Sequence, residues 1–130
     1  MASNKEVGSL FDQFKQAHSR LKEAINIKEE SDIKRDAVIK RFEFTYELLW
    51  KTYKKLARMQ KLDYFNPKAC FRFAFKSGLI NDEGLFLEII DARNKTTHVY
   101  SEQEAKKIYD FIKEKAVNAF SAAEKKIEEM

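Results

Sequence analysis

The chain has 130 residues, of which 44% are hydrophobic and 35% are charged, with only three glycines and one proline. This composition excludes a disordered chain and a turn-rich β fold, and it favours one soluble helical domain spanning residues 1–130. The net charge of +4 comes from 25 basic and 21 acidic residues, a small excess that permits binding to nucleic acid without requiring it.

The first half of the chain predicts two long amphipathic helices. From Val7 to about Lys28, apolar residues recur every three or four positions, which is typical of one buried helical face. After the polar residues 29–32, a second run with the same period contains Trp50 and several other aromatic side chains and ends near Lys61. This second segment is expected to be the longest helix.

A short third helix is expected to begin at the Asn-Pro pair of residues 66–67 and to end before Gly78. One face of this helix carries Lys68, Arg72 and Lys76, which stand four residues apart. A solvent-exposed face is the more frequent explanation of such a stripe. The alternative is a weak RNA-binding surface, because basic side chains neutralise phosphates.

A fourth helix is expected from Asn81 or Asp82 to about Thr96. Ser101, with Glu104 three residues later, forms a capping-box pattern that predicts the start of a fifth and last helix. The connections are short, and short connections favour antiparallel neighbours. The sequence therefore predicts an all-α, five-helix, up-and-down antiparallel bundle.

The only cysteine, Cys70, lies in an apolar stretch and cannot form an intramolecular disulfide, which fits a reducing compartment. The N-terminus lacks the apolar core of a signal peptide, and no segment approaches the ~18 consecutive apolar residues that span a bilayer. We therefore expect a cytoplasmic protein that does not contact a membrane.

Polar residues gather between Arg93 and Tyr100, where the fourth helix is expected to end. Arg93 and His98 would point about 140° apart on an unbroken helix, but a helix end before Ser101 would let them converge. The alternative is an ordinary helix end, because the helix dipole favours arginine and histidine near a C-terminus and Tyr100 would pack on the last helix. Composition alone favours neither the functional site nor the ordinary helix end.

If the residues of this segment are functional, their chemistry fits RNA cleavage by attack of the 2′-hydroxyl on its own phosphate. A histidine such as His98 moves protons near neutral pH, and the planar guanidinium of Arg93 holds the charge that develops on phosphate. Asn94 would hydrogen-bond the phosphate or orient the histidine. No metal is required for this reaction.

Several motifs are absent from the sequence. It has no Asp-x-Asp, no glycine-rich phosphate loop, no cysteine or histidine cluster with metal-ligand spacing, and no G-x-S-x-G. We therefore expect neither a bound metal nor a cofactor, and metal-dependent nucleotidyl transfer would require another polypeptide. The second histidine, His18, lies among apolar positions of the first helix and is predicted to be a partly buried structural residue or a surface residue.

The segment from Arg93 to Tyr100 matches R-x(4)-H-x-Y and resembles the HEPN superfamily. Specifically, it resembles the nucleotidyltransferase substrate-binding proteins, which are related to the C-terminal helical domain of kanamycin nucleotidyltransferase. The long second helix of that family is similar to residues 41–56 of this chain, RFEFTYELLWKTYKKL. The resemblance extends from about Val7 to the last helix. The resemblance implies a five-helix homodimer in which two R-x(4)-H motifs share a cleft.

The resemblance also implies a toxin-antitoxin pair. This chain would be the ribonuclease toxin, with Arg93 and His98 as catalytic residues and RNA as substrate. A minimal nucleotidyltransferase encoded nearby would be the antitoxin, and it would silence the toxin by transferring adenylyl groups from ATP to Tyr100. Two alternatives remain open: a non-catalytic substrate-binding subunit of a two-component nucleotidyltransferase, and a helical scaffold that only mediates assembly.

Overall fold

A computed structural model describes residues 4–99 and 101–130, and these residues form helices and no strand. In chain order the elements are α1 (Asn4–Ile25), α2 (Asp32–Met59), α3 (Pro67–Lys76), α4 (Glu83–Lys95), the 3₁₀ turn η1 (Thr96–His98), α5 (Glu102–Phe111), the π-helical turn η2 (Ile112–Ala116) and α6 (Val117–Glu128). Because α5, η2 and α6 follow one another without a break, they correspond to the single last helix expected from the sequence. The predicted all-α bundle is confirmed.

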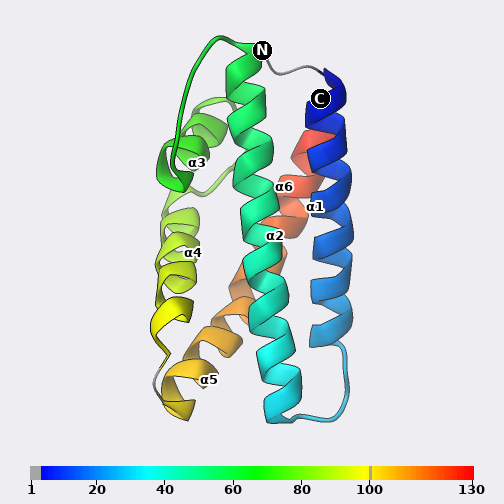
Figure 1. Cartoon of the computed structure of the whole chain (residues 1–130), viewed down its shortest axis with the longest axis vertical. Helices are drawn as coiled ribbons and strands as arrows, with labels where there is room; N and C mark the ends of the chain where they lie inside the picture. Colours follow the sequence, from blue (N-terminus) through cyan, green and yellow to red (C-terminus); the bar gives the residue numbers. More distant parts are fainter. Residues whose placement is uncertain (1–3, 100) are drawn as a thin grey trace.

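The helices run up and down along the long axis of the molecule (Figure 1). α2 is the central element and packs against α1, α3, α5 and η2. α3 and α4 follow one another along one side of α2, and the path from α5 through η2 to α6 returns to the end of the bundle where α1 begins. The turn between α4 and α5 therefore lies at the far end from α3.

Short polar side chains fix the helix starts. Each cap accepts a hydrogen bond from a backbone N–H three residues later, which satisfies a donor that the helix itself leaves unpaired. These caps and their donors are Ser31 with Lys34 (3.1 Å), Asn66 with Ala69 (2.9 Å), Asp82 with Leu85 (3.0 Å) and Ser101 with Glu104 (3.1 Å). The starts predicted at Asn66, Asp82 and Ser101 are thus confirmed.

Two helix ends differ slightly from the sequence prediction. α1 ends at Ile25 and not near Lys28, and Ile27 is half exposed, so the apolar pattern does not continue into a buried face there. α2 ends at Met59 because Lys61 adopts a left-handed conformation with φ of 64°, which turns the chain out of the helix.

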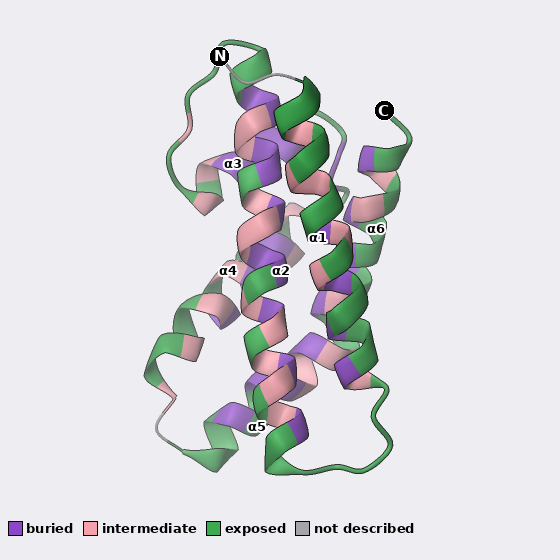
Figure 2. Cartoon of the chain, turned by 45° about the vertical axis from the view of Figure 1, so that its right-hand side comes forward, coloured by how far each residue is buried: buried purple, intermediate pink, exposed green. Residues whose placement is uncertain are grey.

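Aromatic side chains join the helices in the core. The ring of Phe120 on α6 lies 5.9 Å from that of Phe42 on α2 and 6.3 Å from that of Phe14 on α1. Further along, Phe71 on α3 lies 5.6 Å from Tyr46 on α2 and 5.0 Å from Phe86 on α4. The buried residues accordingly follow the inner faces of the helices (Figure 2).

His18 and Cys70 are both fully buried. His18 Nδ1 lies 3.0 Å from Glu124 Oε1, and its Nε2 lies 3.3 Å from the Ser121 hydroxyl, so this histidine joins α1 to α6. Burial raises the pKa of the Cys70 thiol to about 11, which leaves it protonated near neutral pH. Both residues are therefore structural. For His18 this agrees with the predicted structural role, but the residue is fully buried and neither partly buried nor on the surface.

Glu30, in the loop between α1 and α2, joins that loop to α2 and α5. One carboxylate oxygen accepts a hydrogen bond from Lys34 Nζ at 2.6 Å, and the other accepts one from the Tyr109 hydroxyl at 2.8 Å. These two hydrogen bonds lower the pKa of Glu30 below its ordinary value of 4.5, and the bond to Glu30 raises the pKa of Lys34. Glu30 is thus expected to hold the end of α5 against the start of α2.

We expect Glu30→Gln to lower the melting temperature at pH 7, because a buried ammonium would lose its counter-charge. Because the pKa of Glu30 is lower in the folded state than in the unfolded state, its contribution to stability is fully present above the unfolded-state pKa. This contribution is lost as the pH falls through the folded-state pKa. The difference from wild type should therefore shrink as pH falls below about 4.5. Glu29→Gln is the matched control, since Glu29 has no ion pair within the described residues; equal melting temperatures of the two variants at pH 7 would contradict the role of Glu30.

Candidate functional site at the end of α4

The end of α4 has the predicted break in the helix. α4 ends at Lys95, one residue before the predicted Thr96, and a single 3₁₀ turn, Thr96–His98, follows it. Val99 then adopts an extended conformation, with φ of −93° and ψ of 107°. Arg93 and His98 therefore lie on two different helical turns and not on one continuous helix.

Arg93 lies in the last turn of α4, with its side chain 25% exposed. Its Nη1 donates hydrogen bonds to the hydroxyls of Thr96, at 3.2 Å, and Thr97, at 3.4 Å. The Thr96 hydroxyl in turn donates to the Arg93 carbonyl at 2.7 Å. These contacts place the guanidinium alongside the same turn that carries His98.

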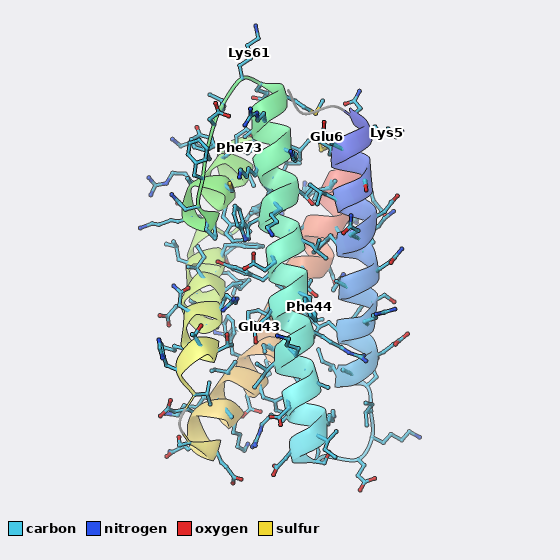
Figure 3. All side chains as sticks on the ribbon, in the orientation of Figure 1. Lys5, Glu6, Glu43, Phe44, Lys61 and Phe73 are labelled. Carbon is cyan, nitrogen blue, oxygen red and sulfur yellow. The ribbon has the colours of Figure 1, made fainter. Side chains whose placement is uncertain are left out.

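Two carboxylates of α2 flank the guanidinium from its other side. Arg93 Nη2 lies 3.8 Å from Glu43 Oε2, and Arg93 Nε lies 3.8 Å from Glu47 Oε1. Both distances are longer than a hydrogen bond, and Arg93 Nε is buried without a hydrogen-bond partner among the described residues. Figure 3 shows Glu43 on the side of α2 that faces α4. The two glutamates thus compensate the charge of Arg93 without taking up all its donors.

The surroundings of Glu47 fix its position. Its second oxygen accepts a hydrogen bond from Trp50 Nε1 at 3.0 Å and lies 3.9 Å from Lys51 Nζ. Burial raises the pKa of neighbouring Tyr46; the charge of Glu47 raises it further, and that of Arg93 lowers it. Tyr46 therefore stays neutral beneath the ion pairs.

The sequence interpretation did not identify Glu43 and Glu47 as part of the site. Both belong to the 41–56 segment that carries the family resemblance, and they are four residues apart, so they project from one face of α2. The only sequence signal for these two residues was a pair of glutamates four positions apart within an aromatic-rich helix. The partner of this acidic face is nearly fifty residues away in the chain, so local pattern alone could not identify it.

The remaining residues predicted for this site lie on the same segment. Asn94 and His98 are exposed, and His98 is the last residue of the 3₁₀ turn. Tyr100, the predicted modification site, lies outside the described residues. The structure thus brings Arg93 to the turn of His98, and the convergence of both side chains on one phosphate stays a prediction.

The predicted basic stripe of α3 lies at the opposite end of α4 from this turn (Figure 1). Lys68, Arg72 and Lys76 are exposed and line a hollow of about 320 Å³. Arg72 Nε lies 3.7 Å from Glu83 Oε2. The stripe and the Arg93 segment are therefore separate surfaces of the molecule.

Within residues 4–99 and 101–130, no three His, Cys, Asp or Glu side chains are grouped so that they would hold a metal ion. None of the helices described in the structure is long and apolar enough to cross a membrane.

The chain belongs to the family described as nucleotidyltransferase substrate binding protein like, which matches residues 9–129. The family predicted from the sequence is thus confirmed. No curated protein matches the chain.

Several solved structures share the fold, and three of them illustrate the range. A tri-AMPylated HEPN toxin of Shewanella oneidensis, solved in complex with its MNT antitoxin, is 15% identical, with a TM-score of 0.80 over 98% of this chain and 100% of that one. A protein of Thermus thermophilus is 29% identical, with a TM-score of 0.73 over 89% and 96% of the two chains. A Haemophilus influenzae protein, described as revealing the fold of a substrate binding domain of a nucleotidyltransferase, is 22% identical, with a TM-score of 0.65 over 94% and 96%.

Proposed function

We propose that this protein is a metal-independent endoribonuclease that acts as the toxin of a toxin-antitoxin pair. The observation that carries the proposal is the guanidinium of Arg93, which is held by two threonine hydroxyls against the turn that bears His98. The fold of an HEPN toxin solved with an MNT antitoxin supports the assignment to such a pair.

In the proposed reaction, the His98 imidazole accepts the proton of a ribose 2′-hydroxyl while that oxygen attacks the adjacent phosphorus. The bond from phosphorus to the 5′-oxygen breaks, the 5′-oxygen takes up a proton, and the products are a 2′,3′-cyclic phosphate and a 5′-hydroxyl end. Arg93 stabilises the negative charge that develops on the phosphate oxygens, and Asn94 supports the phosphate or the imidazole.

The contacts of Arg93 suit this role. Its two ion pairs are long, at 3.8 Å, and its Nη1 bonds to Thr96 and Thr97 are 3.2 and 3.4 Å. A phosphate oxygen is a stronger acceptor than a hydroxyl and would take over these Nη1 donors. The carboxylates of α2 would meanwhile keep the guanidinium plane in place.

The proposal includes a homodimer and a nucleotidyltransferase partner. In the dimer, two copies of Arg93 and His98 share one cleft and double the donors available to phosphate. The partner, a minimal nucleotidyltransferase, transfers adenylyl groups from ATP to Tyr100. The added phosphodiester, two residues from His98, repels the RNA phosphate, and the adenosine fills space in the cleft.

The test is RNA cleavage by the purified protein in the presence of EDTA, before and after incubation with the partner and ATP. The wild-type chain should cleave RNA and should lose this activity after incubation. Tyr100→Phe should cleave RNA equally and stay active, because it lacks the hydroxyl that accepts the adenylyl group. A wild-type protein that leaves RNA intact contradicts the ribonuclease, and a Tyr100→Phe variant that is silenced as fully as wild type contradicts the modification site.

A second candidate function is a non-catalytic subunit that presents a substrate to a separate nucleotidyltransferase. The family description and the Haemophilus influenzae structure favour it. Under this alternative the chain binds the partner, changes which substrate the partner modifies, and cleaves no RNA with any cation. The EDTA experiment therefore separates the two functions.

A further inference from the structure

The hollow beside α3 has an unusual charge. The cations of α3 that line it are Lys68, Arg72 and Lys76, and its other lining residues include no carboxylate. Arg72 has a distant ion pair with Glu83, whereas neither Lys68 nor Lys76 has an ion pair with any residue the structure describes. Like charges four residues apart weaken a helix. The hollow therefore offers uncompensated positive charge.

A second basic cluster, on the C-terminal half of α2, is compensated by contrast. Its ion pairs join Lys51 to Glu47 (3.9 Å), Lys55 to Glu6 (3.2 Å) and Arg58 to Asp63 (3.2 Å). Lys54, the remaining cation of this cluster, has no ion pair within the described residues and lies over the rings of Trp50 and Phe65. The fold thus pairs three of these four α2 cations with its own carboxylates and leaves two of the three α3 cations without such partners. This difference makes α3, and not α2, the candidate surface for an anionic ligand.

Aromatic rings lie beside the hollow. Tyr64 lines it, and its ring packs 6.2 Å from that of buried Phe73. The next residue, Phe65, is 73% exposed, and the ammonium of Lys54 lies 5.7 Å from its ring centroid. A single exposed phenylalanine is common on protein surfaces. Phe65 precedes Asn66, which lines the hollow, so an exposed ring and a basic surface adjoin at the start of α3. Surfaces that bind single-stranded nucleic acid combine these two features, because phosphates meet the charges and a base stacks on the ring.

We propose that this hollow is a binding site for single-stranded RNA, with phosphates on Lys68, Arg72 and Lys76 and a base stacked on Phe65. An acidic protein segment would also meet the cations, but it would gain nothing from the exposed ring. Duplex RNA is excluded because its base faces are already stacked. The first and last of the three cations are eight residues apart, about 12 Å along the helix, which is enough for more than one phosphate.

The inference rests on the proposed ribonuclease, for which it defines how the substrate is held. α4 has 13 residues and separates the hollow from the turn of His98 by about 20 Å. A dinucleotide therefore cannot reach both sites, whereas a longer strand can. The hollow would increase the affinity for long single strands without taking part in the chemistry.

The test measures binding of a fluorescent single-stranded RNA of about 12 nucleotides, a length within the usual range for such surfaces. The full-length His98→Ala variant is used so that the RNA stays intact. Adding Lys68→Ala and Lys76→Ala should weaken binding by on the order of tenfold or more. It should also reduce the slope of log affinity against log salt by about 1.4, since each phosphate contact to a single strand contributes about 0.7.

The matched control adds Lys22→Ala and Lys125→Ala to the same background. Both lysines are exposed, and neither forms an ion pair within the described residues, so the control removes the same net charge from a different surface. It should bind RNA almost as well as the parent. Phe65→Leu should weaken binding by on the order of tenfold with an unchanged salt slope, because only stacking is lost.

Equal affinities of the two lysine double variants would overturn the inference, and so would binding of duplex RNA as tight as that of single strands. If polyglutamate, at the same charge concentration as RNA, displaced the RNA, the hollow would be a site for an acidic protein. That result would also overturn the inference. Because binding is measured without cleavage, these outcomes are independent of the ribonuclease test. A protein that binds as expected but never cuts RNA would contradict only the proposed function.

Discussion

Replacing His98 by alanine is expected to lower the rate of RNA cleavage by a hundredfold or more. General acid-base catalysis contributes about 10²–10⁴-fold to such reactions, and His98 is the only histidine between Arg93 and Tyr100. The loss should fall on kcat and leave KM nearly unchanged, because the phosphate-binding groups remain. Steady-state cleavage of a labelled oligonucleotide over a range of substrate concentrations measures both quantities.

Lys95→Ala is the control for His98→Ala. Lys95 lies three residues from His98, is exposed and, among the residues that the structure describes, forms one ion pair, with Asp91 at 2.9 Å. Its loss removes a neighbouring cation without removing a proposed catalytic group. Lys95→Ala should melt at the wild-type temperature, since its side chain is exposed. The melting temperature of His98→Ala is measured as well, so that loss of folded protein is distinguished from loss of catalysis. If Lys95→Ala and His98→Ala cleave at the same rate, His98 does not transfer the proton.

The sequence was sufficient for most of the fold because its signals are local. Caps such as Asn66 and Ser101 determine where helices start, and the structure shows the hydrogen bonds that those residues predict. The π-helical turn, Ile112–Ala116, was not predicted. Apolar spacing predicts one continuous helix across this turn, and nothing in the local pattern marks the extra residue of a π-helical turn.

The candidate site was predicted only in part, for a similar reason. The helix break between Arg93 and His98 followed from the nearby cap of the next helix. Glu43 and Glu47 were missed because their contact with Arg93 depends on how α2 packs against α4. Whether Arg93 is uncompensated or flanked by carboxylates decides how it responds to mutation, and this was visible only in three dimensions.

Replacing Arg93 by alanine is expected to have two effects, one on activity and one on stability. The rate of RNA cleavage should fall by on the order of 10²–10³-fold, which is typical when one group that stabilises transition-state charge is removed. The free energy of unfolding should fall by roughly 1–3 kcal/mol, because Glu43 and Glu47 would repel each other without the charge between them. Chemical denaturation and single-turnover cleavage measure the two effects separately.

Arg93→Lys separates charge from geometry. Lysine keeps the positive charge between the two carboxylates, but it lacks the planar fork that donates to phosphate oxygens from two nitrogens. Most of the stability should therefore return, while cleavage stays well below the wild-type rate. A lysine variant as active as wild type would show that charge alone is sufficient at this position.

The double variant Arg93→Ala/Glu47→Gln gives the sharper test of the carboxylates. Removing one of the two like charges should restore part of the stability lost in Arg93→Ala, and the glutamine oxygen can still accept the hydrogen bond of Trp50. Cleavage should not recover, because the phosphate-binding guanidinium is still absent. The cycle is completed by Glu47→Gln alone, and a coupling energy near zero would mean that Glu47 does not interact with Arg93. Recovery of stability without recovery of cleavage would instead show that α2 positions the arginine, and that the arginine acts on the RNA.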